Sequence, residues 1–367
     1  MKLRKLLALL MVVSLIGLVP IVSNAEGTAE LSGKLTIWAW GGGIEAEART
    51  EAIELFIAAH PELEVEYSVI PTADSAWDQK ASAALATGTA PDVIQLSPDY
   101  YGMNTEYYMD LRPFVEADGV DLSTVLVDGM INGYYDPDGK LEGFPLLANC
   151  FCVLYNKDMF DAAGVAYPEP GWTLEDLLDW GKAFVGGEGV NQTYAISRHW
   201  VTNSVMAYSG GSGPYSADLS TSYFDSAEML KSLQLYQQLV QGGYMPTDAA
   251  QQSVDAESLF ISGRAAMYFV GGMHSQSTIE DSDESGINYG IAVMPSGVSD
   301  GKEINIQFAT GYAITKTAQN PEAAWQFLKE SAYANDDMCK ATCTSGMTSS
   351  KKIADEYFAN MTYGEKD

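Results

Sequence analysis

Histidine and basic residues are scarce in this sequence. Its 367 residues include 3 histidines and 20 lysines and arginines against 49 aspartates and glutamates, and the formal net charge is −29. Such a charge repels the phosphates of nucleic acids and of anionic lipids, so we expect neither as a partner. Catalytic sequence patterns are missing as well, since G-x-S-x-G, H-E-x-x-H and the phosphate-binding loop do not occur.

The lack of these patterns argues against an enzyme. A serine or cysteine nucleophile needs a neighbouring base, and His60, His199 and His274 have no motif partner. We therefore expect no catalytic residue, no metal and no cofactor. A secreted glycoside hydrolase stays open, because that reaction needs only two carboxylates and acidic residues are plentiful. The segment Asp136–Gly139 hints at a calcium loop, but the further acids of such a loop are missing, which favours a turn.

Cysteine is also rare, with four residues at positions 150, 152, 339 and 343. An exported chain can form disulfides, but Cys150 and Cys152 alternate on a predicted strand and are poorly placed to bond each other. The spacings C-x-C and C-x3-C differ from those of common zinc sites. Buried free thiols, a disulfide between the two pairs and a metal site remain the alternatives, in that order.

The first 25 residues have the pattern of a cleavable secretory signal. Three basic residues precede an apolar stretch over residues 6–19, and small residues stand before Glu26. We therefore predict export to the periplasm or the extracytoplasmic cell surface, with cleavage of residues 1–25 near Ala25. The alternative is an uncleaved anchor, for which the stretch is short, since a bilayer span needs about 20 apolar residues. The cleavage site has no cysteine that could accept a lipid.

Strands and helices alternate along the first hundred residues of the mature chain. β-Branched and aromatic residues predict strands over 34–40, 63–69 and 93–96. Apolar residues at helical spacing predict one helix from Ile44 to His60 and a second around Trp77 and Leu85. This alternation predicts an α/β fold with a parallel sheet that has helices on both faces.

The rest of the chain continues in the same way. Strands are predicted over 143–155, 265–270, 289–294 and 309–315. Helices are predicted after Thr173, over 256–263, from Asn320–Pro321, and with a face formed by Leu233, Tyr236 and Val240. The Ser/Gly-rich segment 209–222 is predicted as a surface loop. After cleavage the chain is long enough for two lobes, each with its own core.

Aromatic residues are plentiful, with 7 tryptophans, 21 tyrosines and 12 phenylalanines. Several follow predicted strands: Trp40 ends the first, Tyr100 stands beside Asp99, and Trp200 comes soon after Arg198. Ligands of open α/β sheets bind where strands end. An aromatic ring can cover the apolar face of a sugar while Asp, Asn and Arg side chains bind its hydroxyls, although a core position is an equal alternative for each ring alone.

Seven segments resemble the extracellular solute-binding proteins of family 1, the maltose-binding-protein-like subunits of ABC importers for carbohydrates. They run in the family's order over nearly all of the mature chain. They are LTIWAWGG, LFIAAHPELEVEY, WDQKASAALATGTAPDVIQL, GFPLLANCFCVLYNKDMFDAAGV with GWTLEDLLDWGKAF, LFISGRAAMYFVGGM, and ATGYAITKTAQNPEAAWQFLKE. The combination of APDV, LYNKDMF and NPEAAWQFL at these separations is specific.

The resemblance implies a type II periplasmic-binding-protein fold, in which two discontinuous lobes are joined by crossing strands and hold ligand in the cleft between them. Lobe 1 would comprise 34–148 plus 300–345, and lobe 2 would comprise 149–299 plus 346–367. Family members usually continue with more helices in the second lobe, so either the sequence is a fragment whose last helices are missing or the second lobe is trimmed. We expect a fragment, because trimming would expose the sheet face that those helices cover.

The resemblance also implies ligand-binding positions. They are Trp40, Gly42, Asp99, Asn149, Gly271, Gly272, Met273, Thr310 and Gly311. Tyr100, Arg198 and Trp200 are further candidates because of their place after predicted strands. Thr310 and Gly311 would form a turn on the ligand side. Met273 stands where the family often has a stacking tryptophan, which puts a maltodextrin-type ligand in doubt, and Trp200 or Tyr100 would stack instead.

The function implied is a receptor that captures a sugar or oligosaccharide and delivers it to an ABC-type importer. Its partners would be a small-molecule ligand and the membrane permease subunits, and the receptor itself would be a monomer. Binding of a polyamine, an osmolyte or a phosphodiester is the alternative, since aromatic rings and acids can also hold a cation.

Overall fold

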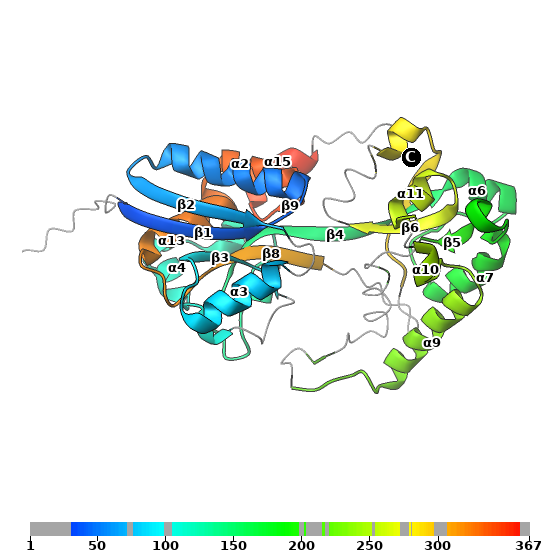
Figure 1. Ribbon diagram of the computed structural model, residues 1–367, viewed down its shortest axis with the longest axis horizontal. Coiled ribbons are helices and arrows are strands. Elements are labelled where there is room, and N and C mark those ends of the chain that lie inside the picture. The colour runs from blue at the N-terminus through cyan, green and yellow to red at the C-terminus, as the bar shows by residue number, and fades with distance from the viewer. Residues whose placement is uncertain are drawn as a thin grey trace, which may run out of the picture.

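Two groups of helices and strands, joined by one long strand, make up the computed structural model (Figure 1). It describes residues 31–71, 76–98, 105–197, 202, 215–216, 220–251, 254–271, 279, 281–296 and 307–359. The strands are β1 (Gly33–Trp40), β2 (Leu63–Ile70), β3 (Val93–Leu96), β4 (Phe144–Asn156), β5 (Tyr194–Ile196), β6 (Ala265–Gly271), β7 (Tyr289–Ala292), β8 (Gln307–Ile314) and β9 (Met347–Thr348).

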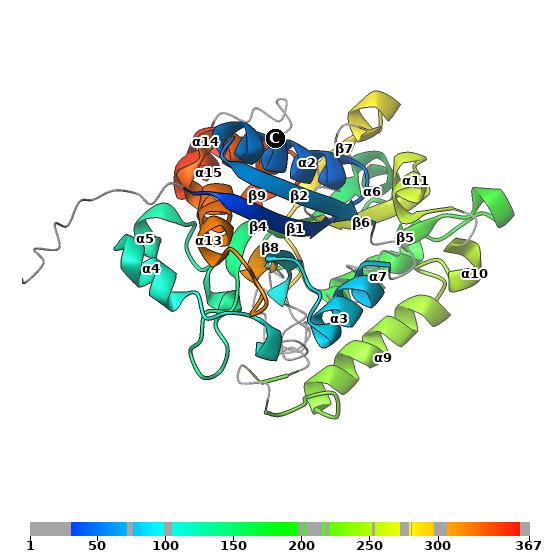
Figure 2. The same cartoon turned by 60° about the vertical axis from the view of Figure 1, so that its left-hand side comes forward.

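The main helices are distributed over both groups (Figures 1 and 2). They are α2 (Ile44–Ala59), α3 (Ala76–Thr87), α4 (Arg112–Asp118), α5 (Leu122–Val125), α6 (Lys157–Ala163), α7 (Leu174–Phe184), α9 (Ala227–Gln241), α10 (Asp248–Gln251), α11 (Ala256–Ile261), α13 (Pro321–Lys329), α14 (Asp336–Cys343) and α15 (Lys351–Ala359). None of the described helices is both long and apolar enough to cross a membrane.

The first group, here called the first lobe, is built on strands in the order β2-β1-β3-β8-β4. β1 pairs in parallel with β2 and β3, as predicted. β8, which was not part of the alternation that predicted the parallel sheet, pairs antiparallel with both β3 and β4. The chain enters β8 from the second group, so no helical crossover from β3 fixes β8 in the parallel direction.

β4 belongs to both groups. Its residues up to Cys150 pair with β8, and Leu147 and Ala148 also pair with β9. From Phe151 onward the same strand pairs with β6 and β7. The second group, here called the second lobe, therefore begins where β4 exchanges β8 for β6, and β4 runs through the space between the groups in Figure 1.

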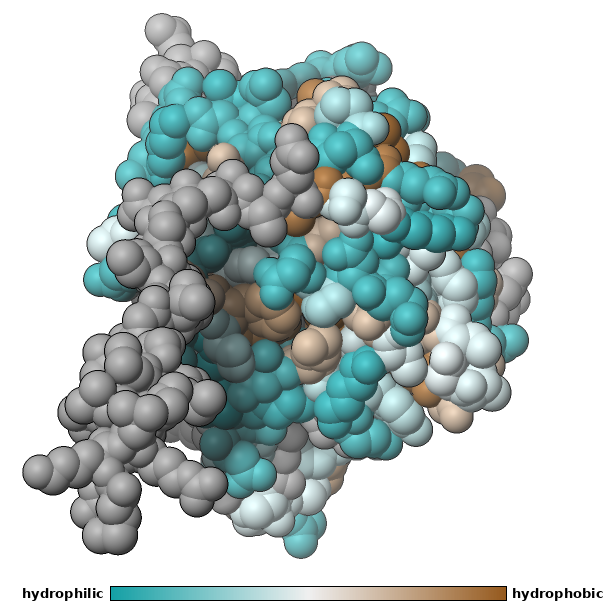
Figure 3. Space-filling model, turned by 90° about the vertical axis from the view of Figure 1, so that its left-hand side faces the viewer, coloured by the Kyte–Doolittle hydropathy of each residue, from teal (hydrophilic) through white to brown (hydrophobic). Residues whose placement is uncertain are grey.

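Each lobe has its own hydrophobic core. The larger core lies in the first lobe and includes Leu35, Ile37, Phe56, Phe144 and Phe327, all almost fully buried. The core of the second lobe is separate and includes Val153, Phe160, Leu177, Met267 and Phe269. Hydrophilic side chains cover most of the first-lobe face seen in Figure 3, in keeping with the large net charge.

Local signals set several helix ends. Thr173 and Asp176 form a reciprocal capping box at the start of α7, and the Asn320 side chain accepts a hydrogen bond from Ala323 N at the start of α13. In α9 the predicted buried face is wrong for Leu233, which is 48% exposed. Ser232, Leu235 and Leu239 are buried instead, so the face of α9 lies one residue away from the predicted one.

The segment after α14 packs on the first lobe, whereas we expected residues 346–367 to belong to lobe 2. Ser349 N donates to Leu146 O at 3.0 Å, and Ile353 of α15 is buried against Cys339 and Cys343. The described part of this segment therefore extends the first lobe, because α15 can bury its apolar face on α14.

Cys339 and Cys343 are buried free thiols. Burial raises the pKa of Cys339 to about 12 and that of Cys343 to about 11, so both remain protonated at neutral pH. Asp136–Gly139 forms a turn closed by a hydrogen bond from Gly139 N to Asp136 O. Within the described residues, no group of acids, histidines and cysteines is arranged to hold a metal ion.

Candidate functional site

The order of the strands creates a crevice between β1 and β3. β1 leads through α2 to β2 on one side, and β2 leads through α3 to β3 on the other side. The helices α2 and α3 lie on opposite faces of the sheet (Figures 1 and 2). Pairing between β1 and β3 is limited to Ile37–Val93 and Trp38–Ile94. Strands that diverge in this way leave a crevice at their carboxyl ends, where open α/β sheets bind ligands.

A cavity of about 300 Å³ lies at this point. Its lining comes from the end of β1, from α3, from β3 and from Tyr108, which forms an isolated β-bridge with Thr315. The lining residues are Trp40, Trp77, Asp78, Ala81, Ser82, Leu85, Ile94, Gln95, Leu96 and Tyr108. Trp40 and Trp77 meet edge to face, with ring centroids 5.0 Å apart. The cavity thus has large aromatic walls, and its polar side chains include those of Asp78, Ser82 and Gln95.

Gln95 occupies the gap between the diverging strands. The residue is 2% exposed, and its Oε1 accepts a hydrogen bond from Trp40 N at 2.9 Å. Its Nε2 is buried and has no hydrogen-bond partner among the described residues. The carboxamide therefore ties the end of β1 to β3 through its oxygen, and its two N–H donors have no acceptor among the described residues.

Behind Trp40 lies a buried ion pair. The side chain of Trp40 hydrogen-bonds to Glu45, whose Oε1 is 3.3 Å from Nη2 of Arg49. Nη1 of Arg49 donates to Ser345 Oγ at 3.0 Å, which links α2 to the loop after α14. Burial raises the pKa of Glu45, and the charge of Arg49 and the bond from Trp40 oppose that rise only in part.

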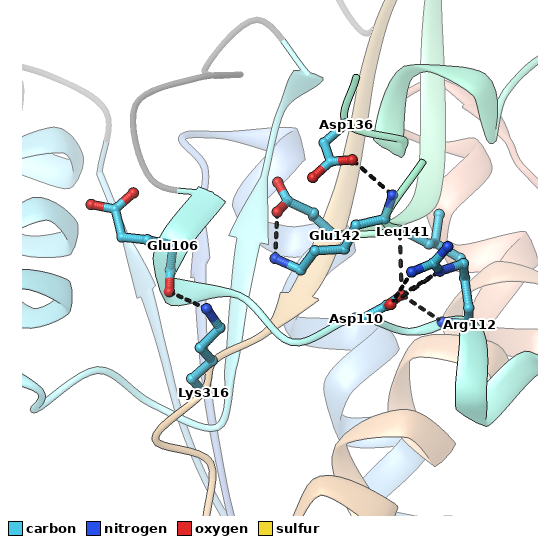
Figure 4. Close-up of polar contacts among 8 residues, drawn as sticks. Glu106, Asp110, Arg112, Asp136, Leu141, Glu142 and Lys316 are labelled. Atoms are coloured by element: carbon cyan, nitrogen blue, oxygen red, sulfur yellow. Dashed lines mark hydrogen bonds and ion pairs between the residues drawn. The ribbon is translucent and has the colours of Figure 1, made fainter. Parts of the chain in front are cut away.

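A second ion pair joins the buried Glu142 to the partly buried Lys140 (Figure 4). Burial raises the pKa of Glu142, and Lys140 counteracts this in part. Burial, together with the negative charges of Glu142 and Glu106, also raises the pKa of Tyr108, so its phenol stays protonated. Figure 4 shows the hydrogen bonds and ion pairs around Glu142.

Asp110 joins Arg112 to Leu141, the residue between Lys140 and Glu142. Its carboxylate binds Arg112 through Nε and Nη2, the latter at 2.6 Å, and accepts a further hydrogen bond from Leu141 N (Figure 4). The Arg112 side chain lowers the pKa of Asp110, against the effect of burial. Asp110, two residues after Tyr108, thereby connects the start of α4 to Leu141.

The structure places the predicted ligand positions in several settings. Trp40 lines the cavity. Gly42 lies between β1 and α2, where its carbonyl accepts a hydrogen bond from Glu45 N. Asn149 lies in β4 next to the point where β4 changes partners, and its buried Oδ1 has no partner among the described residues.

The remaining predicted ligand positions have different surroundings. Gly271 ends β6, and a Cβ there would lie 2.0 Å from the ring of Phe151, so the glycine makes room for that ring. Thr310 and Gly311 lie inside β8, not in a turn as expected, because β8 continues through them to Ile314. Asp99, Tyr100, Arg198, Trp200, Gly272 and Met273 lie outside the described residues.

Sequence reasoning missed most of the cavity lining. Trp77, Leu85 and the strand VIQL were predicted only as parts of a helix and a strand, and Asp78, Ser82 and Tyr108 were not singled out. One usable signal was present, because Gln95 is the single polar residue of an otherwise apolar strand. A polar side chain at such a position needs a hydrogen-bond partner or a ligand.

Comparison with known proteins gives consistent matches over most of the chain. The galactooligosaccharide-binding protein of Bacillus subtilis is 24% identical over 351 residues, which cover 92% of this chain and 77% of that protein. An ABC substrate-binding protein of Listeria monocytogenes, solved with cycloalternan, has a TM-score of 0.75 at 22% identity and covers 90% of this chain and 84% of its own.

A maltose-bound protein of T. maritima has a TM-score of 0.68 at 19% identity, covering 89% of this chain and 85% of its own. These likenesses confirm the predicted fold class, the α/β architecture of maltose-binding-protein-like periplasmic binding proteins. The family of bacterial extracellular solute-binding proteins matches residues 42–331, which is well over half of the sequence. The chain therefore belongs to the bacterial extracellular solute-binding protein family.

Proposed function

We propose that this chain is an exported receptor that captures a sugar or oligosaccharide and delivers it to an ABC-type importer. The observation that carries the proposal is the cavity at the ends of β1 and β3, with aromatic walls from Trp40, Trp77 and Tyr108. Aromatic rings cover the apolar C–H faces of sugars, and Asp78, Ser82 and Gln95 are suited to bind hydroxyls. The sugar-binding relatives of the family support the same ligand class.

Capture would work by closure of the two lobes. The proposed division is 34–148 plus 300–345 for lobe 1 and 149–299 for lobe 2, with residues after 345 on the first lobe as far as Ala359. β4 is the hinge in this proposal, since it changes partners between Cys150 and Phe151. A ligand that touches both lobes favours the closed state over the open one, and the permease reads that state.

The other parts of the proposal concern location and chemistry. Export would use residues 1–25, cleaved near Ala25, and the receptor would act as a monomer without a cofactor. It would not be an enzyme, so bound sugar would leave unchanged.

A thermal-shift screen tests the ligand class. We expect a neutral sugar to raise the melting temperature by several degrees, because a ligand at 100 times its Kd stabilises the native state by about 2.7 kcal/mol. The panel contains glucose, galactose, mannose, maltose, lactose and galactobiose, with spermidine, glycine betaine and glycerophosphocholine as non-sugar solutes. Stabilisation by a non-sugar solute and by no sugar would overturn the proposal.

Chromatography tests the absence of catalysis. Labelled maltose and galactobiose incubated overnight with the protein should be recovered intact, as the receptor role requires. Cleavage products that a heat-denatured sample does not form would instead favour a glycoside hydrolase.

A further inference from the structure

The buried amide nitrogen of Gln95 needs an acceptor from outside the described protein. An N–H group that is buried without a partner costs about 1–3 kcal/mol, so buried polar atoms are nearly always hydrogen-bonded. Gln95 Nε2 is such a group, and the residue lines the cavity. Its oxygen is already engaged by Trp40 N at 2.9 Å, which fixes which end of the amide carries the N–H donors.

The charge around the cavity restricts which kind of acceptor group can bind there. Asp78 lines the same cavity from the first turn of α3, and the described lining residues include no lysine or arginine. A phosphate or carboxylate would therefore meet a like charge with no cation to balance it. The carboxylate in the first turn already complements the N-terminus of α3, which leaves less attraction there for a second anion.

A cationic ligand fails for the opposite reason. An ammonium group has donors only, so it would satisfy Asp78 but leave Nε2 of Gln95 without an acceptor. A hydroxyl group is both donor and acceptor, and neighbouring hydroxyls on one ring can serve Asp78 and Gln95 together. The volume of about 300 Å³ is at the lower limit of small-molecule pockets, which span about 300–1,000 Å³, and suits a single ring.

We infer that Gln95 is the specificity-determining hydrogen-bond donor of this cavity, which takes one uncharged sugar ring and selects against cationic and anionic ligands. The inference rests on the proposed function and deepens it, because it names the size and charge of the group bound and the donor that selects it.

Titration calorimetry with two variants tests this role. Gln95→Met removes the donors at similar length, and Gln95→Glu keeps an acceptor for Trp40 N but replaces the N–H donors at pH 8. We expect each to weaken binding of the best sugar of the panel by about 10- to 100-fold. Gln237→Glu on the exposed side of α9 is the matched charge control and should bind as the unchanged protein does.

Monodeoxy derivatives of that sugar separate the hydrogen bond from a general loss of structure. The unchanged protein should bind one derivative about tenfold more weakly than the parent sugar, and Gln95→Met should bind both equally. If Gln95→Met does not fold, Gln95→Glu is measured against the same series. Variants that bind within twofold of the unchanged protein, or that still discriminate against the same derivative, would overturn the inference alone, whereas failure of the unchanged protein to bind any sugar would overturn the proposed function.

Discussion

The two ion pairs, Glu45–Arg49 and Lys140–Glu142, differ in which member is the more deeply buried. In the first pair the cation is hidden, with side-chain exposures of 1% for Arg49 and 12% for Glu45. In the second pair the anion is hidden, with 2% for Glu142 and 22% for Lys140. Glu45 of the first pair hydrogen-bonds to Trp40, and the charge of Glu142 in the second pair acts on Tyr108, so each pair interacts with a residue that lines the cavity.

This difference decides how each pair responds when a partner is lost. A buried carboxylate can lose its charge by binding a proton, whereas a guanidinium keeps its charge at every ordinary pH. The region of Glu142 and Lys140 should therefore adapt to a lost partner in a way that depends on pH. The region of Arg49 and Glu45 should show no such pH-dependent adaptation, because a guanidinium keeps its charge.

The largest effect is expected from Glu45→Leu. The substitution leaves the Arg49 guanidinium without its carboxylate and removes the acceptor for the Trp40 side chain. We expect a loss of about 3 kcal/mol in the free energy of unfolding, constant between pH 7 and 9, because no group there can discharge. Urea denaturation followed by circular dichroism measures it.

Two variants on α2 serve as controls for this prediction. Glu51→Leu changes an exposed residue of the same helix and should stay within about 0.5 kcal/mol of the unchanged protein. Glu45→Gln retains an acceptor oxygen and should lose far less than Glu45→Leu, since the raised pKa of Glu45 means that the folded state tolerates a neutral group there. A loss below 1 kcal/mol for Glu45→Leu would contradict the importance of the pair.

A smaller, pH-dependent effect is expected from Lys140→Met. Lys140 holds down the pKa of Glu142, which burial has already raised, so its removal raises that pKa further. The folded variant then binds a proton at higher pH than the unfolded chain does, and its stability improves as the pH falls. We expect a deficit of about 2 kcal/mol at pH 8 that shrinks towards zero near pH 4.

Unfolding curves at four pH values between 8 and 4 provide the measurement. Lys182→Met, at an exposed position of α7, supplies the matched control and should show a small deficit that does not vary with pH. A deficit of Lys140→Met that stays the same at all four values would remove the proposed difference between the two regions.

Local patterns were sufficient to predict most of the described strands and about half of the helices. The strand 93–96 is observed with the predicted bounds, and α2 ends at Ala59, just before the predicted stop at His60 and Pro61. Such features depend on neighbours in the sequence, on the alternation of apolar residues and on the unfavourable effect of proline in a helix interior.

Features that join distant segments were not predictable in the same way. The direction of β8 and the position of α15 on α14 both depend on which lobe a segment returns to. Arg49 and Ser345 are 296 positions apart in the sequence. The spacing of Glu45 and Arg49 by four residues can be read from the sequence, but it is common on exposed helices, and only the packing of α2 on α14 shows that this pair is buried.

The smallest effect is expected from Glu142→Gln, and its sign separates the two regions most sharply. In the unchanged protein the pKa of Glu142 is raised, so the ionised carboxylate lowers stability above that pKa and ceases to do so once it is protonated. A neutral amide of the same shape avoids this cost, while Lys140 can turn towards water because its side chain is already 22% exposed. We expect Glu142→Gln to be as stable as the unchanged protein at pH 4 and more stable by up to about 1 kcal/mol at pH 8. Thermal unfolding at the two pH values tests this, and a variant that is less stable at pH 8 would show that the attraction between Lys140 and Glu142 outweighs the burial of the carboxylate.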